Sequence, residues 1–280
     1  MLAPRGDGCY VDCTLGAGGH TAALVAAGAG RVIGIDRDET ALALARERLA
    51  GSPAVEFVHA DYRGLAEVLR ARGLERVDGI VADLGVSSMQ IDEAARGFSF
   101  QQAGPLDMRM DRSRGETLAE RLAGIDAEGL ADVIYRYGEE RQSRRVARSI
   151  LAARDRGELA DTAALASAVR RGVGARGWQR IDPATRTFQA LRIWVNAELE
   201  GLDAFVETAA ARLTAGGRLA VIAFHSLEDR VVKHTLRRLA EGGRVRLLTR
   251  RPIVAGEDEV ARNPRARSAR LRAAERRSDA

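Results

Sequence analysis

The chain has 280 residues, of which 46% are hydrophobic, so it is long enough for one or two domains with a full core. No apolar run reaches the roughly 18 residues of a membrane span and nothing resembles a signal peptide, which predicts a cytoplasmic protein without a membrane segment. The net charge of +5 indicates an anionic partner. The two cysteines, Cys9 and Cys13, suit neither a disulfide framework nor a zinc site, so we expect a reducing compartment and no bound metal.

The first predicted element is a short buried strand at residues 10–14, followed by a loop that contains Gly16, Gly18 and Gly19. A dinucleotide fingerprint would place its third glycine at position 21, where Thr21 stands, and no Gly-Lys-Ser/Thr follows as in a P-loop. The loop therefore has two interpretations. It is a structural tight turn, or it holds a nucleoside cofactor without a pyrophosphate clamp.

The second predicted strand, residues 31–36, favours a cofactor because it ends in an acidic residue. Asp36 follows Gly16 by 20 positions, where a carboxylate can accept both hydroxyl groups of an adenosine ribose. The alternative role, an acid at the start of the next helix, is better met by Asp38. Without a pyrophosphate fingerprint, S-adenosylmethionine fits this pattern better than NAD.

Two further strands are predicted at residues 55–62 and 77–88. The first ends with Asp61 and Tyr62, whose ring can lie against an adenine, and the second contains Asp83 near its end. His59 is interpreted as a partly buried residue rather than a ligand. Because the carboxyl ends of parallel strands meet at one edge of a doubly wound sheet, the four strand ends are expected to lie together.

After Asp83 the alternation of strand and helix stops. A long loop at 84–105 precedes three amphipathic helices, predicted at 126–137, 138–154 and 161–172. The middle helix carries four arginines on and around one side, which is either a solvated face or an RNA-facing surface: Arg141, Arg144, Arg145 and Arg148.

A long helix is predicted at 187–213, and residues 218–230 then return to a strand followed by a helix, with His225 at the strand end. We therefore expect a discontinuous catalytic domain, residues 1–104 and 190–280, interrupted by a helical substrate-recognition domain at 105–189. From about residue 249 the chain is predicted to form a basic tail. Its arginine-rich segment at 261–277 is either solvated and disordered or in contact with RNA phosphates.

The chain resembles the ribosomal RNA small subunit methyltransferase H family. The resemblance is carried, in order along most of residues 10–276, by "DCTLGAGGHT", "IGIDRD", "DLGVSS", "RGFSFQQAGPLDMRMD", "YGEER", "ATRTFQALRIWVNAELE", "FHSLEDR" and "NPRARSARLRAAER". It implies an α/β class I (Rossmann-like) methyltransferase fold with an inserted helical domain. It also implies a 16S rRNA (cytosine-N4)-methyltransferase that uses S-adenosylmethionine on a cytidine of the decoding region.

The resemblance also implies a set of site residues. Asp83 and His225 are the catalytic candidates, and the expected cofactor contacts are Gly18, Gly19, His20, Asp36, Tyr62, Asp83 and Gln90. Family members often carry phenylalanine in place of Tyr62, so the ring is kept. They also carry a longer segment with a His-x-Pro-Val-like motif before the first strand, where this sequence has only residues 1–8, and we expect the difference to affect enclosure of the cofactor.

The chemistry at N4 needs positioned hydrogen-bond acceptors more than a covalent group. Asp83 suits contact with the cytosine amine or, equally, with the amino group of the cofactor's methionine. Methylation at carbon 5 would need a cysteine near the fourth strand, and the cysteines lie on the first. The alternatives are a methyltransferase for another RNA base or a small molecule, and a non-catalytic RNA-binding factor for ribosome assembly. The expected partner is small-subunit rRNA or a ribosomal particle, and a homodimer is a candidate assembly.

Overall fold

The computed structural model describes residues 1–174 and 182–278. Its internal contacts divide the chain into two compact units. The first unit joins residues 1–85 to residues 199–280, and the second is formed by residues 86–198. The second unit contains the predicted insertion at 105–189 together with its flanking segments. A role for that insertion in substrate recognition stays a prediction.

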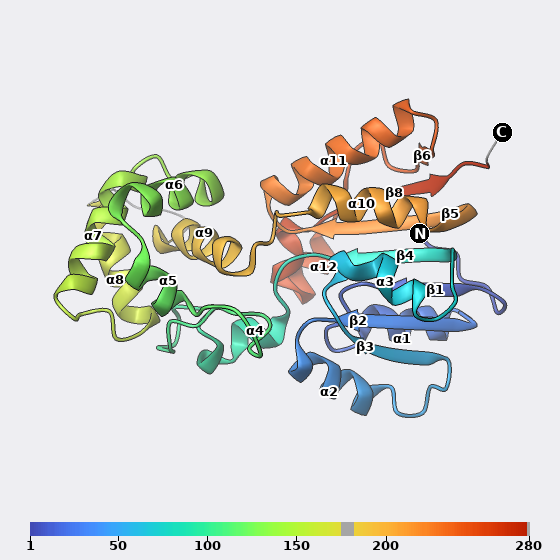
Figure 1. Cartoon of the computed structure of the whole chain (residues 1–280), viewed down its shortest axis with the longest axis horizontal. Coiled ribbons are helices and arrows are strands. Elements are labelled where there is room, and N and C mark those ends of the chain that lie inside the picture. The colour runs from blue at the N-terminus through green and yellow to red at the C-terminus, as the bar shows by residue number, and fades with distance from the viewer. Residues whose placement is uncertain (175–181, 279–280) are drawn as a thin grey trace. The chain divides into compact units, whose positions relative to one another are not determined.

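The first unit is built on one eight-stranded sheet (Figure 1). The order along it is β3-β2-β1-β4-β5-β8-β6, with β7 paired to β8. Strands β1 to β5 run parallel to one another, whereas β8 lies between β5 and β6 and runs antiparallel to both. This confirms the predicted doubly wound α/β sheet. The strands are β1 (Cys9–Asp12), β2 (Arg31–Asp36), β3 (Val55–His59), β4 (Val77–Asp83), β5 (Leu213–Ala223), β6 (Val245–Leu247), β7 (Ile253–Val254) and β8 (Arg270–Arg276).

Helices cover both faces of this sheet because successive strand residues point to opposite sides. Val11 and Ile33 face a core completed by α3, α10 and α11, while Tyr10 and Val32 face a smaller core with α1. The helical elements of the first unit are α1 (Gly19–Ala26), α2 (Glu39–Arg48), η1 (Tyr62–Gly64), α3 (Leu65–Arg70), α10 (Leu202–Ala211), α11 (Ser226–Glu241), α12 (Glu257–Arg262) and η3 (Pro264–Ser268).

The second unit is helical and has its own apolar core, which includes Leu118, Ile134, Ile150 and Leu165 (green to yellow in Figure 1). The predicted helices at 126–137 and 161–172 are confirmed. The one predicted to begin at 138 begins later, because Glu139 adopts a left-handed φ of 50°. The elements are α4 (Ser88–Asp92), η2 (Ala94–Arg96), α5 (Leu118–Gly124), α6 (Ala127–Gly138), α7 (Ser143–Asp155), α8 (Thr162–Val173) and α9 (Ala184–Asn196).

The single long helix predicted at 187–213 was wrong. Two helices, α9 and α10, occupy this segment, and the chain between them turns at Ala197 and Gly201, whose φ angles are 49° and 68°. Apolar residues recur at helical spacing on both sides of the turn, so periodicity alone could not reveal the break. The turn is also the place where the chain passes from the second unit back to the first.

The predicted basic tail was also wrong for the last residues of the segment. Residues 270–276 form β8, an interior strand of the sheet, in which Ala273 and Ala274 are buried. The side chain of Arg272 is buried as well, and its Nε lies 2.6 Å from Oδ1 of Asp229 on α11. Its charge therefore serves the fold. No helix in the described residues is both long enough and apolar enough to span a bilayer.

Candidate functional site

The glycine loop after β1 leaves open space above its backbone. Gly18 has a φ of +79°, and a Cβ there would lie 2.8 Å from Cδ1 of Leu49, so no other residue fits without strain. A Cβ on Gly19, the first residue of α1, would meet nothing within 4 Å. Gly18 is thus required by the fold, whereas Gly19 presents a bare surface that a ligand can approach.

Asp36 joins this loop to the end of β2. Its Oδ2 accepts a hydrogen bond from the Gly16 amide at 2.7 Å, and its Oδ1 accepts one from the Asp38 amide at 2.8 Å. Burial raises the pKa of the Asp36 carboxyl above its ordinary value. Each carboxylate oxygen has a second lone pair, so ribose hydroxyl groups can still donate to it. The sequence predicted the ribose contact but not this role in shaping the loop.

Asp83 and His20 lie together at the carboxyl end of β4. Nε2 of His20 is 3.2 Å from Oδ2 of Asp83, and the Asp83 amide donates to Oγ1 of Thr14 at 2.6 Å. This hydrogen bond from the imidazole to Asp83 raises the pKa of His20. The other oxygen, Oδ1 of Asp83, is buried and has no hydrogen-bond partner among the described residues. A buried acceptor without a partner is costly, so a ligand that donates to it gains affinity.

Tyr62 follows β3 as the first residue of η1. Its ring packs edge-on against Phe205 of α10, with centroids 4.6 Å apart, and the Arg63 guanidinium lies 5.7 Å from its centroid. Burial raises the pKa of the Tyr62 hydroxyl. The preceding Asp61 holds Arg63 through an ion pair of 2.6 Å, a contact the sequence did not reveal. His59 is exposed, and its Nε2 lies 3.1 Å from the Arg37 carbonyl oxygen.

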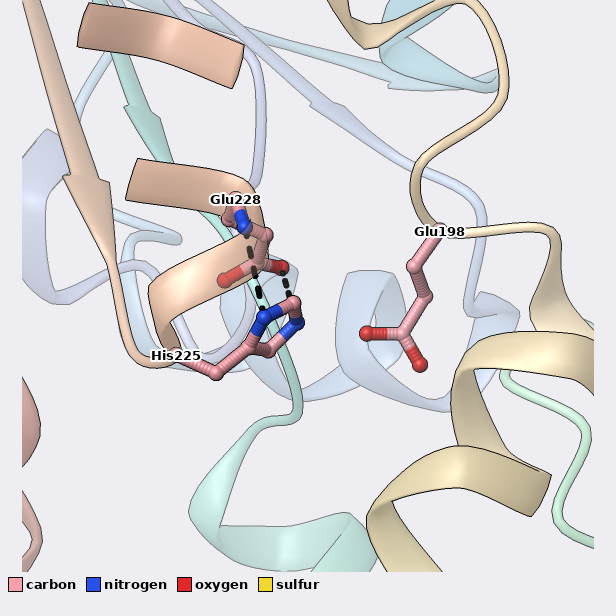
Figure 2. Close-up of side chains that lie close together, drawn as sticks. All are labelled: Glu198, His225 and Glu228. Atoms are coloured by element: carbon pink, nitrogen blue, oxygen red, sulfur yellow. Dashed lines mark hydrogen bonds and ion pairs between the residues drawn. The ribbon is translucent and has the colours of Figure 1, made fainter. Parts of the chain in front are cut away.

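His225 lies after β5, which pairs with β4, and it caps α11. Its Nδ1 accepts the Glu228 amide at 3.3 Å, and its Nε2 is 3.3 Å from Oε1 of Glu228 (Figure 2). Both side chains are almost fully buried, at 8% and 1% exposure. Because Nδ1 accepts a hydrogen bond from an amide, a neutral ring carries its proton on Nε2. The described contacts of His225 are structural, and its part in the reaction stays a prediction.

Gln90 belongs to the second unit, where it stabilises the start of α4. Its backbone N–H donates to Oγ of Ser87 at 3.3 Å, and its side-chain Oε1 accepts the backbone N–H of Ser87 at 3.0 Å. The two hydrogen bonds form a capping box on α4. The predicted contact of Gln90 with the cofactor stays a prediction. The other predicted site residues, from Gly18 to His225, all lie in the first unit.

Asp12 is a residue of this site that the sequence analysis missed. It ends β1 immediately before the glycine loop and is fully buried. Its Oδ2 accepts the Thr21 hydroxyl at 2.8 Å, and burial raises the pKa of its carboxyl to about 6. Perturbed carboxyls of this kind concentrate at functional sites. The signal was present in the sequence as an acid between a buried strand and three glycines.

Strand order, glycine loop and strand-end acids together define a class I methyltransferase fold. The residues fit S-adenosylmethionine: Asp36 can accept its ribose hydroxyls, Gly19 leaves room for close approach, and the partnerless Oδ1 of Asp83 can accept from its ammonium group.

Comparison with known proteins gives the family. The profile of the MraW methylase family matches residues 1–277. The ribosomal RNA small subunit methyltransferase H of Sorangium cellulosum is 57% identical over 276 residues, which cover 98% of this chain and 87% of the relative. Proteins of the same name from Bradyrhizobium diazoefficiens and Pelobacter propionicus are 52% and 47% identical, covering 99% of this chain and 88% and 95% of the relatives. The chain belongs to the MraW methylase family of S-adenosylmethionine-dependent methyltransferases.

Proposed function

We propose that this protein transfers a methyl group from S-adenosylmethionine to N4 of a cytidine in the decoding region of small-subunit rRNA. The family and the name of its relatives support the substrate. The observation that carries the proposal is the carboxylate of Asp83, which ends β4 with one oxygen paired to His20 and the other buried without a partner among the described residues.

The bound cofactor supplies an electrophilic methyl group on a sulfonium. Asp36 would hold its ribose, Gly18 and Gly19 would let it approach the backbone, and Tyr62 would lie beside its adenine. Two donors suit Oδ1 of Asp83 equally well: the ammonium group of the cofactor's methionine and the amine of the base. In either case a carboxylate acts by fixing the geometry of donor and acceptor.

Cytosine N4 is a weak nucleophile because its lone pair is delocalised into the ring. An acceptor for one amino proton favours a more pyramidal nitrogen, which frees the lone pair toward the methyl group. The N4 proton becomes acidic once the new bond has formed, so a strong general base is not needed. This agrees with a site that offers a positioned carboxylate and a histidine engaged in capping a helix.

Methylation at carbon 5 is disfavoured by the state of the cysteines. That reaction needs a thiolate nucleophile. Cys13 is buried beside β1, and desolvation raises its pKa well above the ordinary value; Cys9 is half-buried and its pKa is raised for the same reason. Neither belongs to β4, and although the Cys13 amide donates to the Val81 carbonyl of β4, its thiol is buried. The exocyclic amine is therefore the better target.

RNA contact is also proposed for the second unit. The arginines predicted to lie on and around one side of a helix are exposed in the structure, although Arg141 precedes α7. Within the described residues their side chains have no ion pair or hydrogen bond: Arg141, Arg144, Arg145 and Arg148. Such charges suit phosphate contact. We further propose that the substrate is small-subunit rRNA, free or within a ribosomal particle, that the protein acts in the cytoplasm, and that it can assemble as a homodimer.

Mass spectrometry of rRNA nucleosides tests the activity. Small-subunit particles that lack the modification are incubated with the protein and S-adenosylmethionine. We expect N4-methylcytidine to appear with the wild-type protein and to be absent when the protein is omitted. Another methylated nucleoside would point to a different base. Cofactor binding without any methylated product would favour a non-catalytic assembly factor.

A further inference from the structure

A pocket lies at the amino-terminal end of β4, at the edge of the sheet opposite the predicted cofactor site. Its volume is about 820 Å³. Arg76, immediately before β4, lines it together with residues 242–244 before β6 and residues 276–278 after β8. Since β4 runs from Val77 at this edge to Asp83 at the other, the pocket and the predicted methyl-transfer site lie at opposite ends of the same strand.

The rim of this pocket is cationic. Four arginines line it: Arg76, Arg244, Arg276 and Arg277. Its one carboxylate, Glu207, is already neutralised by an ion pair with Arg238. The Arg277 amide donates to the Arg244 carbonyl at 3.1 Å, which fixes these two residues side by side. Among the described residues, the side chains of Arg244 and Arg277 have no hydrogen-bond or ion-pair partner. Within the described residues, the lining of the pocket therefore carries an excess of positive charge.

The floor of the pocket is apolar. Ala210 and Leu239 are buried beneath it, and Nη1 of Arg276 donates to the Ala211 carbonyl at the end of α10. Gly243 has a φ of +73°, and a Cβ there would meet nothing within 4 Å. The apolar floor suits contact with a sugar or a base. The arginines of the rim suit phosphate groups, because a planar guanidinium matches phosphate oxygens in a bidentate geometry.

We propose that this pocket binds the phosphodiester backbone of RNA as a second contact, away from the site of methyl transfer. The proposal rests on the proposed function for the identity of the RNA. Small-subunit rRNA is long enough to reach both edges of the sheet. A contact here adds affinity without touching the cofactor, so the two properties separate experimentally.

The test removes the two arginines without partners. Binding of the R244Q/R277Q variant to a small-subunit rRNA transcript is measured by filter retention at several KCl concentrations. We expect roughly tenfold weaker binding and a salt slope reduced by about 1.5, the scale for two lost phosphate contacts. The control R70Q/R237Q makes the same change in net charge at two exposed arginines outside the pocket and should keep a slope close to wild type. Calorimetry should give all three proteins the same affinity for S-adenosylmethionine.

The outcomes separate the two proposals. Equal slopes for wild type and R244Q/R277Q would overturn the pocket proposal while leaving rRNA methylation untouched. Failure of the wild-type protein to bind either the rRNA transcript or small-subunit particles would overturn both. A variant that binds rRNA normally but loses binding to polyglutamate would assign the pocket to an acidic polypeptide and reject RNA as its partner.

Discussion

The two oxygens of the Asp83 carboxylate have different surroundings, and the Asp83→Asn variant tests what their shared charge contributes to the reaction. The substitution keeps the shape but replaces a charged acceptor by a neutral amide. We expect methyl transfer to fall by about 10²-fold, the scale for losing one positioned polar group, with a melting temperature near that of wild type. Single-turnover rates at saturating cofactor measure the effect. Near-normal rates would remove Asp83 from the reaction.

The partner of Asp83 should titrate visibly. Because the hydrogen bond with Asp83 raises the pKa of His20, an NMR titration of Asp83→Asn should give His20 a lower pKa than in wild type. A pKa that is higher in the folded than in the unfolded state stabilises the fold below the ordinary value of 6.5, and the stabilisation is lost as pH rises through the folded pKa. His20→Gln should therefore cost more stability at pH 5.5 than at pH 8.5. An equal cost at both pH values would contradict the pairing.

At the scale of elements, two adjacent glycines make different demands on the loop between β1 and α1. Gly18→Ala places a Cβ against Leu49 at a left-handed φ, so we expect a loss of about 1–3 kcal/mol in the free energy of unfolding. Gly19→Ala places its Cβ in open space and should leave the melting temperature unchanged while weakening S-adenosylmethionine binding. Thermal unfolding and calorimetry on both variants check this. A stability loss in Gly19→Ala would contradict it.

The last strand makes the C-terminal segment indispensable. Deleting residues 270–277 removes β8 from between β5 and β6, and we expect the first unit to lose its cooperative unfolding transition. Arg272→Met leaves Asp229 short of its buried partner and should cost about 3 kcal/mol. Arg267→Gln, an exposed arginine of the same segment, serves as the control and should unfold like wild type. If the truncated protein still unfolds cooperatively, the segment is not needed for the fold and the prediction of a solvated tail would stand.

Considered as a whole, the molecule has a separate core in each unit, so damage to one should spare the function of the other. Ile150 is fully buried in the second core, and Ile150→Ala should cost about 2–5 kcal/mol there. Cofactor affinity measured by calorimetry should stay close to wild type. Ile33→Ala in β2 is the matched variant, expected to weaken both stability and cofactor binding because Asp36 ends the same strand. Weakened binding in Ile150→Ala would contradict this independence.

Residues that act through short-range patterns were predictable from sequence. The glycine loop and the strand-end acids Asp36 and Asp83 follow from periodicity and from where polar groups interrupt apolar runs. Features that depend on distant partners were not. Arg272 lies in an arginine-rich segment typical of a solvated tail, and only the structure shows that Asp229 on α11 neutralises its charge. The break at Ala197 is set by the backbone, with no signal in hydrophobic spacing.

The interrupted sheet has a consequence for synthesis on the ribosome. β4 and β5 are neighbours in the sheet, yet residues 86–198 must be translated between them. At about 5–20 residues per second this takes on the order of ten seconds, during which β4 has an open edge. β8 is translated later still, so the sheet is completed only after residues 270–276 have left the exit tunnel. If the helical unit folds before β5 is made, the flexible loop between β4 and β5 is shorter, which lowers the entropic cost of pairing the two strands.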